Sequence, residues 1–525
     1  MVTAQETKKA AWQWIEDHHQ WLSDLHRQIW HLAEPAFREY RSARVYLDLL
    51  RQNGFTVEEG SGEMPTAFVA TWGSGSPVLA SFAEYDAVPG NSQQPVPYQA
   101  PREGLHPWAA GHTDPHSSLG VAALMGILAA KAVMEQQQLP GTLKLFGEPA
   151  EKVCGSKPVH AAKGYYDGID AAVVYHPHTT STTVWDTHCG SYWSAAFTFE
   201  CLEPERWVDP SLLASPDRPH TVPRCPGALD AVCLMYTNTK YTKEAMFPHT
   251  GTWTLNEFIM AGGQCTSDNL PPPFGQIQYA WRSPTLDIQE RIYQVLENNA
   301  RHAAEVTGCT VSTRWITKTR VGLPNRSLAD LTYRNLELVG PPQYDETARE
   351  FGRKIQQSLG LEPMDDPFTA DNQRLVTPRD WEEITRRGLP PWQSCFTSDD
   401  YVEYTWHAPT VRLLTARPRL RAPEPGYTYP MWTLNAMGGV SECIDPGMFI
   451  AGKTVATTLT DLLTQPSLLA EAQAEFQERT GGGIGGSSWV APLLPADFPP
   501  PTDLRWPEYI ETPRGQEWWI PTPNS

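Results

Sequence analysis

The first 190 residues alternate short apolar runs with longer stretches of helical periodicity. Apolar runs bounded by glycine or proline are typical of buried strands, and they occupy residues 66–73, 77–86, 141–151 and 170–178. Residues 117–137 are apolar nearly all round, which predicts a buried helix. Residues 7–53 repeat apolar positions every three or four residues and predict two amphipathic helices. Alternating strands and helices indicate an α/β class, a catalytic α/β/α domain with a mainly parallel sheet.

The pattern changes after residue 190. Four strands and two helices are expected in the order β–α–β–β–α–β, at 192–203, 227–240, 252–264, 275–283, 288–308 and 309–320. This order predicts a ferredoxin-like domain that interrupts the first one. A further strand at 409–416 and a buried helix at 446–463 indicate that the first domain then resumes.

A chain of 525 residues exceeds one ordinary core, so more than one domain is expected. We predict a first catalytic part at 1–190, an inserted domain at 191–335, a second catalytic part at 336–470, and a Pro- and Trp-rich tail at 471–525. The glycine-rich stretch 481–486 lies inside that tail and predicts a linker.

Charge and composition narrow the function classes. The formal net charge is −19, so the chain lacks the basic footprint of a nucleic-acid-binding protein. It has no uninterrupted run of about 18 apolar residues, so no membrane span is expected. The N-terminal segment lacks the apolar core of a secretory signal, and the nine cysteines are scattered and odd in number. We therefore expect reduced thiols and a cytoplasmic protein.

The stretch "GHTDPH" places His112, Asp114 and His116 at every second position, and Pro115 disfavours a helical conformation before it. In an extended segment these side chains point the same way. The motifs "AEYD", "GEPAE" and "YHPH" follow or end predicted strands, and ligands of parallel sheets bind at the carboxyl ends of strands. Histidines and carboxylates gathered there suit zinc or manganese.

The motif order "AEYDAVPG … GHTDPHSSLG … GEPAEKVCGSK … AAVVYHPH" resembles the aminoacylase and carboxypeptidase type of metallopeptidase. Within that family it is most similar to the p-aminobenzoyl-glutamate hydrolases and, more distantly, to the auxin-conjugate amidohydrolases. The resemblance covers nearly the whole chain. It implies that the inserted domain is a lid that also dimerises, so a homodimer is expected.

The resemblance also implies a role for each matching residue. Metal ligands would be Asp114, His116 and His176; the general base would be Glu151; Asp86 would be an acidic residue beside the metal; and Asn269 and Arg282 would hold a substrate carboxylate. His220 lies near the position of a further lid residue, although it is out of register.

Two positions depart from the family pattern. Lys152 stands where relatives carry a second glutamate that binds metal, and no histidine occurs from 408 to 525, where relatives carry a late ligand. A lysine ammonium has no acceptor, so it would repel a second ion or neutralise Asp114 or Glu151. We therefore predict at most one divalent ion, zinc or manganese, and count Lys152 among the catalytic-site residues.

The resemblance implies a hydrolase that cleaves the amide bond of a small N-acyl or N-aroyl amino acid, with Glu151 activating water. Two alternatives stay open. A divergent site with little or no metal could form amides or rearrange a substrate. The chain could also be a non-catalytic protein that binds such compounds as part of a larger assembly.

Overall fold

The structure is a computed structural model that describes residues 4–203, 226–249, 252–262 and 272–519. The chain divides into two compact units. The first contains residues up to 188 together with 322–394 and 401–519, and the second contains 189–321 and 395–400. The asparagine and histidine predicted to bind substrate, Asn269 and His220, lie outside the described residues.

A seven-stranded sheet forms the centre of the first unit. In spatial order its strands are β1 (Thr56–Glu59), β2 (Phe68–Ser74), β4 (Gly141–Gly147), β3 (Val78–Ala83), β5 (Ala171–His178), β12 (Thr410–Ala416) and β6 (Thr182–Thr183). The four strands from β4 to β12 run parallel, and the outer pairings are antiparallel. Strands β3, β5 and β12 are buried along almost their whole length, as expected for parallel strands covered on both faces. The predicted α/β class is confirmed.

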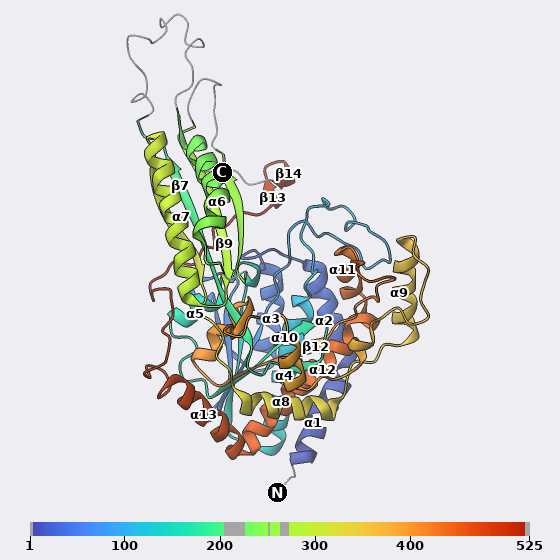
Figure 1. The fold of residues 1–525 in the computed structure, drawn as a ribbon. Coiled ribbons are helices and arrows are strands. Elements are labelled where there is room, and N and C mark those ends of the chain that lie inside the picture. The colour runs from blue at the N-terminus through green and yellow to red at the C-terminus, as the bar shows by residue number, and fades with distance from the viewer. Residues whose placement is uncertain (1–3, 204–225, 250–251, 263–271, 520–525) are drawn as a thin grey trace, which may run out of the picture. The chain divides into compact units, whose positions relative to one another are not determined.

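Helices of the first unit surround this sheet (Figure 1). They are α1 (Ala4–Asp17), α2 (His19–Leu32), α3 (Tyr40–Gln52), α4 (His116–Gln137), α5 (Lys157–Ala162), α8 (Arg326–Val339), α9 (Glu346–Ser358), α10 (Pro378–Arg386), α11 (Trp432–Gly438), α12 (Ser441–Thr464) and α13 (Pro466–Thr480). Short 3₁₀ segments are η1 (Ser61–Glu63), η2 (Glu151–Val153), η6 (Ala370–Gln373) and η7 (Asp400–Trp406).

The expectation of two helices in residues 7–53 is wrong, because the segment folds into three. The first helix ends at Asp17, and the second ends where Ala33 takes a left-handed conformation just before Pro35. Continuous periodicity hides such breaks, because each new helix restarts the same apolar spacing.

Helices α4 and α12 pack against each other at very short range. A side chain at Gly126 of α4 would come within 2.4 Å of Val455, and one at Gly452 of α12 within 2.2 Å of Met125. Helix α4 is long and apolar enough to cross a membrane by composition alone, but 89% of its apolar window is buried in the fold. It also contacts β3 and β5, so it is a core helix.

The second unit has the predicted ferredoxin-like order. Its elements are β7 (His188–Glu200), α6 (Ala228–Met246), β8 (Thr254–Ala261), β9 (Phe274–Ser283), α7 (Leu286–Thr307) and β10 (Thr310–Lys318). The antiparallel sheet runs β10-β7-β9-β8, and helices α6 and α7 pack together beside β9. A fifth strand, β11 (Cys395–Ser398), comes from much later in the chain and pairs with β7.

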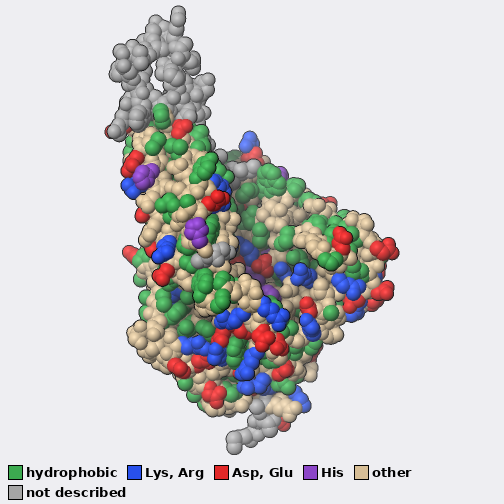
Figure 2. All heavy atoms as spheres, viewed as in Figure 1, with side chains coloured by type: hydrophobic (Ala, Val, Ile, Leu, Met, Phe, Trp, Pro, Cys, Tyr) green, Lys and Arg blue, Asp and Glu red, His purple; other side chains and the backbone are tan. Residues whose placement is uncertain are grey.

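The tail ends in a hairpin, β13 (Glu508–Thr512) and β14 (Gly515–Trp519), that the sequence pattern did not indicate. It is fastened to the first unit. The Arg38 guanidinium donates to the backbone carbonyl of Leu504 at 2.7 Å, and the His106 ring stacks on Trp518. On the face shown in Figure 2, acidic and basic side chains are interspersed.

Candidate active site

The candidate site lies where the parallel strands of the first unit end. Glu84 and Asp86 follow β3, Glu151 opens η2 after β4, and His176 is near the end of β5. Helix α4 begins at His116. Since the carboxyl ends of parallel strands share one edge, residues far apart in the sequence meet here, as the motifs predicted.

The loop before α4 has the shape that Pro115 favours. The backbone is not helical through Pro115, which has φ −81° and ψ 67°. Asp114 and His116 project into the same cluster, with Asp114 Oδ2 3.6 Å from His116 Nε2. His112 is fully buried, and burial lowers its pKa well below the ordinary value, so its imidazole is neutral. Of the three side chains that the spacing predicts to point the same way, Asp114 and His116 therefore lie in the cluster.

Lys152 is the centre of this cluster. Its ammonium donates to Asp114 Oδ2 at 2.9 Å, to Glu151 Oε2 at 2.9 Å and to His116 Nε2 at 2.7 Å. Burial opposes the charge on Lys152, but Asp114 and Glu151 hold its pKa well above the usual value. Burial likewise opposes the two carboxylates, and the Lys152 charge holds the pKa of each well below its usual value. All three groups are therefore ionised at neutral pH.

The Asp86 carboxylate orients the ring of His116. Asp86 Oδ1 lies 2.7 Å from His116 Nδ1, and the Lys152 ammonium lies 2.7 Å from His116 Nε2. Because an ammonium has no acceptor, we assign the acceptor role to Nε2 and the ring proton to Nδ1, which then donates to Asp86. Asp86 Oδ2 also accepts from the backbone N–H of Lys152 at 2.9 Å. Asp86 is wholly buried, so it supports the reactive groups and does not itself face solvent. The family resemblance had placed it beside the metal, and its contacts show which group it supports.

Glu84 is a site residue that the sequence reasoning missed. Its Oε2 lies 3.2 Å from His116 Nε2, and its Oε1 accepts from the buried Lys157 ammonium at 2.7 Å. The signal was present, because Glu84 and Asp86 stand two residues apart at the end of a strand. Residues with that spacing share one face, so a role for one implied proximity of the other.

The fold family implies a divalent metal, and the donor atoms test that implication. Glu84, His116 and His176 each offer a ligand atom, and the three atoms lie within 4.8 Å of one another. Two imidazoles and a carboxylate are a known ligand set for one catalytic zinc. His176 donates through Nδ1 to the carbonyl of Pro177, so Nε2 is the ring nitrogen that would bind an ion. Lys152 stands among the remaining acidic groups, so a second ion does not fit.

The loop that carries Glu151 is tightly built. Ala150 and Cys154, which flank η2, both take left-handed conformations with φ of 59° and 50°. The Ala150 N–H donates to the buried carboxyl of Glu39 at 2.9 Å. Unusual backbone conformations persist where the surrounding structure enforces them, and they are frequent at functional sites.

Arg282 lies in the second unit, on β9, with its guanidinium 5.0 Å from the centre of the Tyr192 ring. Its predicted role in holding a substrate carboxylate stays a prediction. Two further histidines, His178 and His188, have pKa values lowered to about 3, chiefly by burial. His188 Nδ1 lies 2.7 Å from the Tyr401 hydroxyl, the contact of an ordinary structural histidine.

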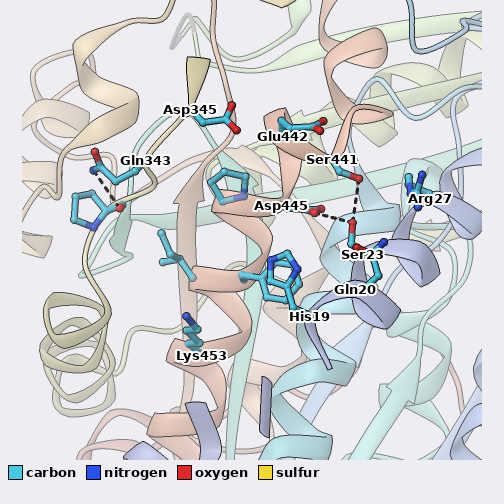
Figure 3. Close-up of a pocket in the computed structure, with 14 residues that line it drawn as sticks. His19, Gln20, Ser23, Arg27, Gln343, Asp345, Ser441, Glu442, Asp445 and Lys453 are labelled. Carbon is cyan, nitrogen blue, oxygen red and sulfur yellow. Dashed lines mark hydrogen bonds between the residues drawn. The ribbon is translucent and has the colours of Figure 1, made fainter. Parts of the chain in front are cut away.

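A separate cavity of about 600 Å³ opens between α2, α12 and the segment before α9 (Figure 3). Asp345, Glu442 and Asp445 line it. Asp445 accepts from the Ser23 hydroxyl at 2.6 Å, and burial raises its pKa to about 6. Among the described residues Asp445 forms no ion pair, in contrast to the carboxylates around Lys152.

No model of a protein family matches the chain. The chain is 28% identical over 476 residues to one of the subunits of p-aminobenzoyl-glutamate hydrolase from Escherichia coli (strain K12), covering 89% of this chain and 94% of that protein. The resemblance to the aminoacylase and carboxypeptidase type of metallopeptidase therefore extends over nearly the whole chain.

Further proteins are similar over a smaller part of the chain or in fold alone. The chain is 28% identical to the Xaa-Arg dipeptidase of Mus musculus over 58% of this chain and 64% of that protein. A crystal structure of an aminobenzoyl-glutamate utilization protein from Klebsiella pneumoniae superposes with a TM-score of 0.53 at 14% identity, covering 86% of this chain and 98% of that one.

Proposed function

We propose that the protein hydrolyses the amide bond of a small N-acyl or N-aroyl amino acid, of the kind that p-aminobenzoyl-glutamate represents. The convergence of Glu151, His116 and Lys152 at the carboxyl edge of the sheet carries this proposal. It places a base, an oriented imidazole and a cation close enough together to act on the same group of a substrate. The full-length similarity to a hydrolase of an N-aroyl amino acid supports the substrate class.

Each residue of the cluster has a separate role in the proposed reaction. Glu151 is ionised, so it can take a proton from the attacking water and later deliver it to the leaving amine. Lys152 is the nearest cation to Glu151, at 2.9 Å, and it can stabilise negative charge that develops on the carbonyl oxygen. Asp86 fixes the ring of His116. If Lys152 moves away from His116 Nε2, the residues Glu84, His116 and His176 would hold one divalent ion, zinc or manganese, which would supply Lewis-acid polarisation of the carbonyl.

We further propose that two copies of the chain associate through the second unit. Strand β8 is the last strand of its sheet, and Phe258 and Ile259 on it are each about half exposed, at 52% and 51%. An edge strand with apolar side chains is suited to pairing with another chain. A homodimer is therefore expected in solution, with a small molecule as the other partner. A cytoplasmic location stays a prediction.

The experiment for the proposed activity is Glu151→Gln, assayed against a panel of N-acyl and N-aroyl amino acids that includes p-aminobenzoyl-glutamate. The change keeps the shape of the side chain and removes its basicity, so kcat should fall by about two to four orders of magnitude. Glu135→Gln on the exposed side of α4 is the matched control and should keep full activity. Near-normal turnover by Glu151→Gln would reject the role of Glu151.

The position of Lys152 favours a second candidate, in which the same residues catalyse another reaction of an amide or of its two components. An intact chain that binds N-acyl amino acids without cleaving them would support either this candidate or a purely binding role. Formation of a new product from the bound compound separates these two.

A further inference from the structure

We infer that the ammonium of Lys152 is a resident cation that takes the place of a metal ion among Asp114, His116 and Glu151. The inference concerns the site of the proposed function and rests on it only for the expectation of a metal. The ammonium contacts Asp114, His116 and Glu151 at 2.7 to 2.9 Å, and all three offer atoms of the type that bind zinc.

The ammonium and an ion exclude each other. Zinc lies about 2.0–2.2 Å from nitrogen and carboxylate oxygen ligands, so an ion bound to His116 Nε2 and Asp114 Oδ2 would overlap Lys152 Nζ, which is 2.7 and 2.9 Å from these atoms. His116 has one lone pair on Nε2, because Nδ1–H is directed to Asp86. While Lys152 uses that lone pair, an ion cannot.

The charges reach the same conclusion. Asp114 and Glu151 would repel each other in a partly buried site, and the ammonium between them removes most of that cost. The family resemblance implies an acidic ligand at the position of Lys152, and with such a residue an ion would have to supply the positive charge. In this chain the lysine side chain supplies the positive charge, so the charges of Asp114 and Glu151 are partly neutralised in the folded site before any ion binds. Any ion must displace Lys152 first.

Zinc binding to four versions of the full chain tests this inference: wild type, Lys152→Gln, Lys152→Glu and Lys131→Gln. Lys131 forms a surface ion pair with Glu135 at 2.6 Å, so it is the control for loss of a lysine charge. Each protein is dialysed against a chelator and titrated with zinc sulfate alone. Bound zinc is measured by elemental analysis, and the thermal midpoint is recorded with and without zinc.

Wild type and Lys131→Gln should bind zinc weakly, with thermal midpoints that the chelator does not change. Lys152→Gln should bind zinc about 10- to 1,000-fold more tightly, because a like charge a few ångströms from the ion is removed. Its midpoint should be lower without zinc and recover with zinc. Lys152→Glu should bind at least as tightly as Lys152→Gln. If Lys152→Glu fails to fold, the glutamine variant decides alone.

Equal zinc affinity in wild type and Lys152→Gln would overturn the inference, and so would the absence of zinc binding in both Lys152 variants. Loss of the proposed function is a different result. An enzyme that lacks amidohydrolase activity can still show the shift in zinc affinity, and an active enzyme can fail to show it.

Discussion

Two groups of buried carboxylates in the first unit have pKa values that are shifted in opposite directions. At the carboxyl edge of the sheet, Asp114 and Glu151 share the ammonium of Lys152, and their pKa values are held well below the usual range. In the cavity between α2 and α12, Asp445 has a serine hydroxyl for a partner, and its pKa rises to about 6. The nearby cations are engaged elsewhere, because Lys453 pairs with Glu16 and Arg27 pairs with Asp24.

The difference shows that a cation within hydrogen-bonding distance, more than burial, decides in which direction the pKa of each carboxylate moves. A hydrogen bond from a hydroxyl offsets only part of the cost of removing a carboxylate from water. The same acidic residue type therefore stabilises the fold at neutral pH in one place and weakens it in the other.

Lys152→Met should have the largest effect on stability. It leaves Asp114 and Glu151 without their cation, and breaking a buried pair by removing one partner costs about 3–5 kcal/mol. The depressed pKa values mean that this stabilisation is present above the ordinary values of 3.8 and 4.5 and is lost as pH falls below them. Urea unfolding in the presence of a chelator, at pH 7 and at pH 4, measures both effects. A loss that is equal at the two pH values would contradict the charge argument.

Asp445→Asn should change stability less and with the opposite sign. The raised pKa means that Asp445 favours the folded state most below its ordinary value of 3.8 and loses that contribution as pH rises through about 6. The asparagine variant should therefore be more stable than wild type by about 1–3 kcal/mol at pH 8 and nearly equal to it at pH 4. Thermal unfolding across this range is the measurement. Destabilisation at pH 8 would show that the Asp445 carboxylate has a cationic partner in solution.

Ser23→Ala should have the smallest effect, about 1 kcal/mol, because it removes one hydrogen bond to Asp445. The Ser23 hydroxyl lowers the pKa of Asp445, so its removal should move the pH dependence of stability to higher pH. An unchanged pH profile would mean that the hydroxyl does not stabilise the carboxylate. Ser358→Ala, which removes a hydroxyl bonded only within its own helix region, is the control.

The sequence predicted the sheet and the second unit well because both depend on local pattern. The strand from 170 to 178 and the buried helix from 117 to 137 match β5 and α4 to within one residue. The break near His18 was invisible, since apolar spacing continues on both sides of it. The pairing of β11 with β7 was also beyond prediction, because nearly 200 residues separate strands that only the folded chain brings together.

The site was predictable as far as motif and spacing go. Asp114, His116, Glu151 and Lys152 were named from the sequence, and they meet in the structure. Glu84 and its buried partner Lys157 were missed. The sequence around Lys157 does not indicate which acid it will contact, because Glu84 lies 73 residues away and only folding brings the two together.

The origin of β11 limits how the second unit can be exchanged. Residues 189–321 look like a continuous insert that could be removed or transplanted as one piece. Yet the second unit takes its fifth strand from residues 395–398, which follow α8, α9 and α10 in the sequence. Replacing 189–321 with a short linker would leave β11 without β7 and expose an unpaired backbone edge, which invites aggregation. A working domain swap must therefore carry both segments.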